Sequence, residues 1–157
     1  YDNEMVNVCI DTKNQSKRLY TASHELFHIL YMKYILTNDY SKRIVWYDEG
    51  MAQFMSGEKD SLNDNSIFKG FYMKVKEETK VIPQMNNLKH GNSFVNDGYN
   101  GYDLSYLAIK YLSDILSAKQ FKDLMSDFKK ISQLGDDIIQ KMFSYYDEKL
   151  ENKIVKK

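Results

Sequence analysis

The stretch TASHELFHILYMKY, residues 21–34, most constrains the fold, because it places two histidines and a glutamate among mostly apolar residues. The apolar spacing predicts a buried helix, which we expect over residues 17–36. Burying polar groups without partners costs about 1–3 kcal/mol for each group. His24, Glu25 and His28 therefore need partners, and we predict that a zinc ion is that partner.

The three polar residues form the pattern His-Glu-x-x-His. On a helix, His24 and His28 lie on one face, roughly 6 Å apart along the axis, where two imidazoles can bind one Zn²⁺ at about 2.0–2.1 Å. Glu25 is rotated by about 100° from His24, which places its carboxylate beside the metal. The alternative is a helix with two histidines at the edge of the core and a solvated glutamate.

A catalytic zinc site also needs a third protein ligand and an open position for water. The segment WYDEGMA, within a helix that we expect over residues 43–55, supplies Glu49 as the candidate. Gly50 and Ala52 are small and would let this helix approach the metal helix closely. A glutamate in a surface helix is more often simply solvated, so the prediction that Glu49 is a ligand depends on the preceding His-Glu-x-x-His motif.

Together, HELFH and WYDEGMA resemble the gluzincin metallopeptidases of the peptidase MA clan, which include the clostridial-type collagenases. The segment GYDLSYLAIKYL, residues 101–112, is similar to a downstream helix of that family, and residues 134–150 resemble its closing helix. The resemblance covers residue 4 to about residue 150. One departure is Ser117, near a position where such domains often have glycine.

The resemblance implies a zinc-dependent peptidase that binds one zinc per chain. His24, His28 and Glu49 would be the zinc ligands, and Glu25 would be the general base that activates water and later moves its proton. We predict an endopeptidase acting on a peptide or protein substrate, because no Gly-x-Met-Glu-Asn segment typical of aminopeptidase gluzincins is present.

A further hydrogen-bond donor is expected to stabilise the oxyanion that forms at the scissile carbonyl. We predict that this donor is Tyr102, because the resemblance places the start of its helix beside the cleft. Tyr99, Tyr106 and His90 remain alternatives. With 13 tyrosines in the chain, any one of them is more often a packing residue than a catalytic one.

The expected fold class is α+β and zincin-like, in one domain over residues 1–157. Residues 1–40 would supply a small N-terminal sheet and the metal helix, and residues 41–157 the glutamate helix and a mostly helical lobe. The alternating segment at residues 4–10 predicts an edge strand that pairs with the substrate backbone, or else an ordinary edge strand. Further helices are expected near residues 65–80, 102–116, 118–131 and 136–154, with a loop over residues 83–101.

Composition excludes several other classes of protein. Lysine plus arginine and aspartate plus glutamate number 22 each, so nothing favours nucleic acid as a partner, and no segment is long and apolar enough to span a membrane. The single cysteine, Cys9, excludes an internal disulfide framework and a cysteine-based metal cluster. The chain starts at Tyr1, which fits a piece excised from a longer protein. We expect a monomer, and an extracytoplasmic or secreted bacterial location is slightly favoured over the cytoplasm.

Two other hypotheses compete with the peptidase. One is a catalytically silent domain of the same fold that binds or senses a peptide or a cell-wall component. The other is a helical scaffold in which the motif is accidental. The presence of Glu25 argues against the silent domain, because a protein without turnover has no chemical need for this residue.

Overall fold

The part of the chain that the structure describes is built almost entirely from helices. The computed structural model describes residues 15–59, 64–77, 81–88, 93–94, 98–134 and 137–154. Its α-helices are α1 (Gln15–Leu30), α2 (Val45–Ser56), α3 (Asp64–Lys76), α4 (Gly101–Ile115), α5 (Ala118–Met125), α6 (Phe128–Ser132) and α7 (Ile138–Ile154). A π-helical turn, Tyr31–Ile35, continues α1, and short 3₁₀ turns cover Tyr40–Lys42 and Met85–Asn87.

The prediction of an α+β fold with a small N-terminal sheet is wrong. The strands among the described residues are β1 (Ser93–Phe94) and β2 (Tyr99–Asn100), which pair antiparallel inside the stretch predicted to be a loop. Two strands of two residues are too short to form a layer, so the described core is helix packed on helix. The edge strand predicted at residues 4–10, which contains Cys9, lies outside the described residues.

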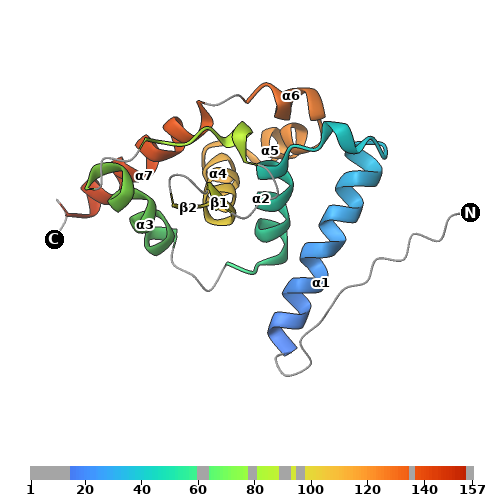
Figure 1. Cartoon of the computed structure of the whole chain (residues 1–157), viewed down its shortest axis with the longest axis horizontal. Helices are drawn as coiled ribbons and strands as arrows, with labels where there is room; N and C mark the ends of the chain where they lie inside the picture. Colours follow the sequence, from blue (N-terminus) through green and yellow to red (C-terminus); the bar gives the residue numbers. More distant parts are fainter. Residues whose placement is uncertain are drawn as a thin grey trace, which may run out of the picture.

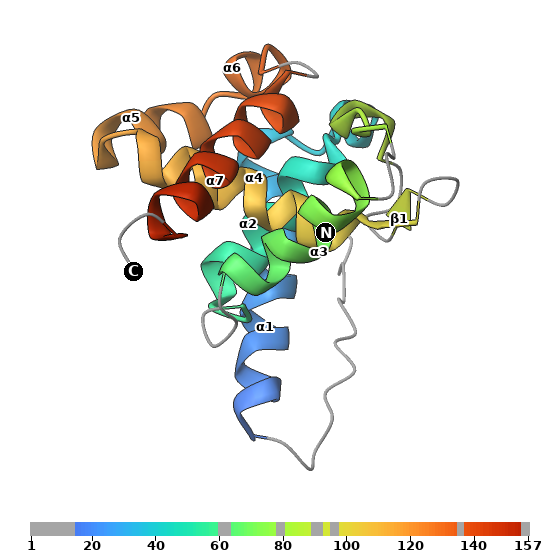
Figure 2. The same cartoon turned by 90° about the vertical axis from the view of Figure 1, so that its left-hand side faces the viewer.

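Helices α2 and α4 form the centre of the packed structure, as Figures 1 and 2 show. They approach so closely that a Cβ atom on Gly50 would lie 2.4 Å from the backbone oxygen of Ser105. Gln53 joins the same helices, because its amide donates to the carbonyl oxygens of Glu49 and Tyr102 at 3.1 and 3.0 Å. The position of α2, and with it Glu49, is therefore fixed by the core.

Helix α1 packs against α2, and its N-terminal half projects beyond the other helices (Figures 1 and 2). None of the side chains described for residues 19–30 is fully buried. Tyr31 is the next residue and is buried; at this point the helix becomes π-helical and the chain turns toward α2. None of the helices that the structure describes has the length and the apolar character needed to cross a membrane.

Candidate metal centre

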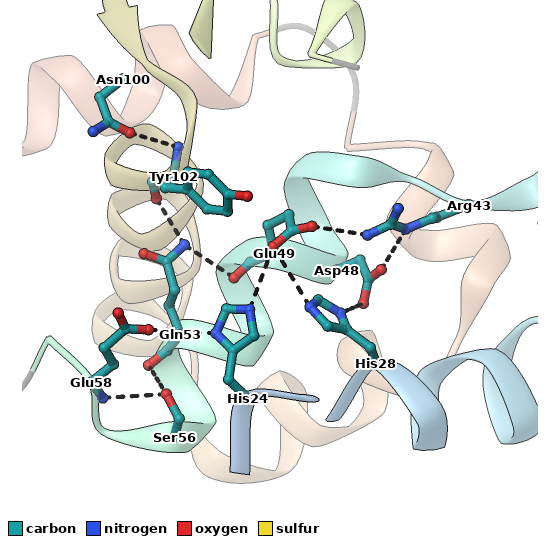
Figure 3. A network of polar contacts seen from close by, with 10 residues as sticks. All are labelled: His24, His28, Arg43, Asp48, Glu49, Gln53, Ser56, Glu58, Asn100 and Tyr102. Atoms are coloured by element: carbon teal, nitrogen blue, oxygen red, sulfur yellow. Dashed lines mark hydrogen bonds and ion pairs between the residues drawn. The ribbon is translucent and has the colours of Figure 1, made fainter. Parts of the chain in front are cut away.

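Three side chains predicted to bind metal converge between α1 and α2. The ligand atoms offered by His24, His28 and Glu49 all lie within 4.8 Å of one another. Figure 3 shows both imidazoles pointing from α1 toward the Glu49 carboxylate on α2. The Nε2 atoms of His24 and His28 each lie 3.6 Å from Glu49 Oε2.

The local sequence explains this convergence. Four residues correspond to roughly one helical turn, so His24 and His28 occupy one face of α1, and their ring centroids are 4.8 Å apart. Glu49 lies in the first half of α2, on the part of that helix that packs against α1. Gly57, with a φ of 71°, then ends α2 in a left-handed conformation that glycine adopts at little cost.

The separations between the three side chains fit a metal better than they fit hydrogen bonds. A distance of 3.6 Å is too long for a hydrogen bond between an imidazole and a carboxylate. Two ligand atoms bound at about 2.0–2.1 Å to a tetrahedral zinc lie roughly 3.3–3.4 Å apart. Two imidazoles and one carboxylate are also the donor set of a catalytic zinc site, so these residues fit that ion.

Asp48 fixes the orientation of one of the histidines. Its Oδ1 atom lies 2.7 Å from His28 Nδ1, and only 1% of the residue is exposed. When Nδ1 donates to this carboxylate, the lone pair of Nε2 faces Glu49 and is available to a metal. Burial lowers the pKa of His28, but the hydrogen bond and charge of Asp48, with smaller contributions from Glu49 and Glu25, raise it overall. A metal ion therefore competes with a proton for Nε2.

Glu49 is held as a carboxylate although only 7% of the residue is exposed. Burial raises its pKa, but the neighbouring His24, His28 and Arg43 outweigh this effect and lower the pKa below its usual range. Arg43 Nη2 donates to Glu49 Oε1 at 2.9 Å, which leaves Oε2 directed at the two histidines. One oxygen of this carboxylate is thus available to a metal.

Glu25 lies at the junction of two pockets. A pocket of about 570 Å³ extends from Glu25 and His28 toward the C-terminal end of α1, where Met32 and Tyr40 also line it. A second pocket of about 390 Å³ extends from His24 and Glu25 in the opposite direction and includes Tyr102. The Glu25 side chain therefore borders open space on both sides of the histidine pair.

The candidate oxyanion donors occupy different environments. Tyr102 follows the Asn100 cap of α4, and its ring reaches toward the metal centre (Figure 3). Burial raises the pKa of Tyr102, and the negative charge of Glu49 adds to this effect. The alternatives Tyr99 and Tyr106 are both buried in the hydrophobic core, and His90 lies outside the described residues.

Two further residues of this centre, Arg43 and Asp48, were not predicted from the sequence. Asp48 directly precedes Glu49, and a carboxylate that binds the second nitrogen of a metal-ligating histidine is a common feature of zinc sites. That general expectation could have identified Asp48. Arg43 precedes α2 in a turn, and only the fold shows that it reaches both carboxylates.

Comparison with known proteins identifies one family. The chain matches the family model described as collagenase, peptidase M9, over residues 3–152. This match covers both segments that form the candidate metal centre and extends through most of α7. Neither a curated protein nor a solved structure matches the chain significantly.

Proposed function

Because the chain belongs to the collagenase family of metallopeptidases, which hydrolyse peptide bonds, we propose that it is a zinc-dependent endopeptidase of the gluzincin type. The observation that carries this proposal is the convergence of His24, His28 and Glu49 at separations close to those of zinc ligands. Residues 1–157 would form one catalytic unit that binds one zinc. The same donor set also accepts cobalt or manganese in vitro.

His24, His28 and Glu49 would hold the zinc, which would supply a Lewis acid for the scissile carbonyl and would lower the pKa of a water molecule toward 7. Glu25 accepts the proton of the attacking water, because its carboxylate lies one residue from His24 and borders both pockets. Glu25 then delivers this proton to the nitrogen of the departing amine, so protons balance over the reaction.

Tyr102 is the proposed donor to the oxyanion of the tetrahedral intermediate. A tyrosine hydroxyl is protonated at neutral pH, burial raises its pKa further, and its ring lines the same pocket as His24 and Glu25. We expect Tyr102→Phe to lower turnover at least about tenfold and to leave the metal content unchanged. Steady-state kinetics with elemental analysis tests this role, and turnover equal to that of the wild type would remove Tyr102 from the mechanism.

An endopeptidase needs room for the substrate on both sides of the scissile bond. The two pockets that meet at Glu25 extend in opposite directions along α1, and they support binding of a chain that continues past the site at both ends. An exopeptidase would instead need one end of the site to be closed around a terminal charge. The paired pockets therefore favour internal cleavage.

The proposal is tested by measuring metal content and cleavage on the same preparations. The wild type should contain about one zinc per chain by elemental mass spectrometry, and Glu49→Ala should lose it. The wild type should cleave an unfolded protein such as gelatin or casein, and a chelator should stop cleavage. Absence of zinc after reconstitution would overturn the proposal, whereas zinc without cleavage of any peptide library would favour a silent binding domain.

Glu25→Gln separates chemistry from metal binding. The substitution keeps the shape of the side chain but removes the base, so we expect turnover to fall about 10²–10⁴-fold with zinc content unchanged. Glu148→Gln is the control, because Glu148 is an exposed glutamate on α7 that lines neither pocket. Cleavage that survives in Glu25→Gln would exclude Glu25 as the general base.

A further inference from the structure

We propose that Arg43 is the positioning residue of the metal centre and acts on two of its three ligands at once. This inference rests on the proposed zinc site. Arg43 Nε donates to Asp48 Oδ2 at 2.6 Å, and Arg43 Nη2 donates to Glu49 Oε1 at 2.9 Å. Figure 3 shows the guanidinium spanning the two carboxylates. One contact holds a metal ligand directly, and the other holds the carboxylate that orients His28.

In each of the two carboxylates, one oxygen accepts from Arg43 and the other faces histidine. Asp48 uses Oδ2 for Arg43 and Oδ1 for His28 Nδ1, while Glu49 uses Oε1 for Arg43 and directs Oε2 at both histidines. Arg43 therefore restricts Glu49 to binding a metal through one oxygen. It also keeps Asp48 where the Nδ1–H of His28 can donate to it.

The site requires an arginine rather than any cation. Asp48 and Glu49 are adjacent and buried, so their charges repel each other unless a partner neutralises them in place. The planar guanidinium donates two hydrogen bonds in fixed directions, one to each carboxylate. A lysine ammonium is a point charge on a flexible stem and does not reproduce this fork.

His24 provides an internal contrast. No contact joins it to Arg43 among the described interactions, and its Nδ1 lies 3.5 Å from Glu58, whose side chain is half exposed. Arg43 itself is anchored in the turn before α2, where its N–H donates to the Tyr40 carbonyl oxygen at 3.1 Å. Loss of Arg43 should therefore disturb Glu49 and His28 while leaving the backbone of α1 in place.

The test compares Arg43→Met and Arg43→Lys with a neighbouring control, Lys42→Met. Lys42 forms an ion pair at 2.9 Å with exposed Asp39, away from the ligands. Each protein is loaded with Co²⁺, and the visible absorption is recorded together with kcat and KM. The Nδ1–H resonance of His28 is followed by ¹⁵N-edited NMR in the metal-free proteins, which gives a signal that does not depend on activity.

In Arg43→Met we expect kcat to fall about 10- to 100-fold with little change in KM. The cobalt absorption should weaken, because Glu49 becomes free to bind through both oxygens and the ion becomes five-coordinate. The His28 Nδ1–H signal should broaden or disappear in the metal-free protein. Arg43→Lys should restore none of these properties, and Lys42→Met should match the wild type.

A wild-type cobalt spectrum together with an unchanged His28 signal in Arg43→Met would overturn the inference. If that variant does not fold, Arg43→Lys decides the question, and wild-type spectra in it would overturn the need for the fork. If the wild type binds no cobalt and the His28 signal is nevertheless lost in Arg43→Lys, the proposed zinc site is overturned. That same result would support the positioning of Asp48 and His28 by Arg43.

Discussion

Helices α1 and α2 both contribute to the candidate metal centre, but they are held in different ways. Residues 46–53 of α2 are buried in an unbroken run, whereas none of the side chains described for residues 19–30 of α1 is fully buried. Glu49 is therefore positioned by the core, and the two histidines are positioned mainly by the site itself. Glu49 is thus placed by folding, whereas His24 and His28 would depend more strongly on a bound metal.

The outer side of α1 strengthens this contrast. Leu19, Leu26, Leu30 and Tyr34 remain between 43% and 65% exposed, although their spacing predicted a buried helix. A hollow of about 480 Å³ beside Leu30 has an almost wholly apolar lining and includes none of the three candidate metal ligands. Apolar side chains on α1 thus contribute less to the described core than the sequence pattern indicates.

Removal of metal should give the largest difference between α1 and α2. At a free metal concentration of about 1,000 times Kd, binding stabilises the folded state by about 4 kcal/mol, and that contribution is lost on chelation. Hydrogen exchange followed by mass spectrometry should then become faster in α1 than in α2 or α4, because α1 has fewer buried contacts. An equal increase in α1 and α2 would show that the two helices do not depend on metal to different degrees.

Gly50→Ala tests the tightly packed side of the comparison. The added methyl group would meet the Ser105 carbonyl oxygen at 2.4 Å and the Ile109 side chain at 2.8 Å, so α2 and α4 must move apart. We expect the free energy of unfolding to fall by about 1–3 kcal/mol, as for other overpacked sites, with a loss of metal affinity as Glu49 shifts. Denaturant unfolding with and without metal measures both effects.

Gly70→Ala is the matched control for Gly50→Ala. Gly70 lies within α3, and a Cβ atom there meets nothing within 4 Å. Alanine is favoured over glycine inside a helix by about 1 kcal/mol, so this variant should be slightly more stable than the wild type. If Gly50→Ala were as stable as Gly70→Ala, close packing of α2 on α4 would not be what positions Glu49.

Features that depend on local spacing could be predicted from the sequence. The spacing of His24 and His28 placed both imidazoles on one face of a helix, and the small residue after Glu49 indicated a close helix contact. That contact is made mainly with α4 rather than with the metal helix, as the clash of Gly50 with Ser105 shows. Local spacing identified the small residue but not its partner.

Features that depend on tertiary contacts were either not predicted or predicted wrongly. Arg43 lies five and six residues before the carboxylates it binds, outside regular helix, and no periodic pattern marks it. The α+β fold was inferred from a single alternating segment, whereas apolar residues elsewhere recur at helical spacing and pack helix on helix. A location outside the cytoplasm stays a prediction, because neither fold nor family match bears on it.

Asp114→Asn gives the smallest expected effect. It removes an exposed carboxylate, in contrast to the buried carboxylates of Asp48 and Glu49. Asp114, on α4, accepts hydrogen bonds from Lys110, Tyr145 and Lys149, at 2.5, 3.0 and 3.1 Å. Burial raises its pKa and is the largest single effect, but the hydrogen bonds from these three side chains and the charge of Lys110 together outweigh it and lower the pKa overall. Exposed ion pairs contribute little, so we expect a loss of less than about 1 kcal/mol at pH 7, measured by denaturant unfolding.

The pH dependence of this loss has a defined sign. A carboxyl group whose pKa is lower in the folded state stabilises the protein above its unfolded pKa of about 3.9, and this contribution disappears as the pH falls through the folded value. The stability difference between wild type and Asp114→Asn should therefore close below about pH 4. Asp123→Asn, which removes the partner of the highly exposed Lys119, is the control with a smaller difference. A difference for Asp114→Asn that widens in acid would mean that Asp114 does not stabilise the folded state as a carboxylate.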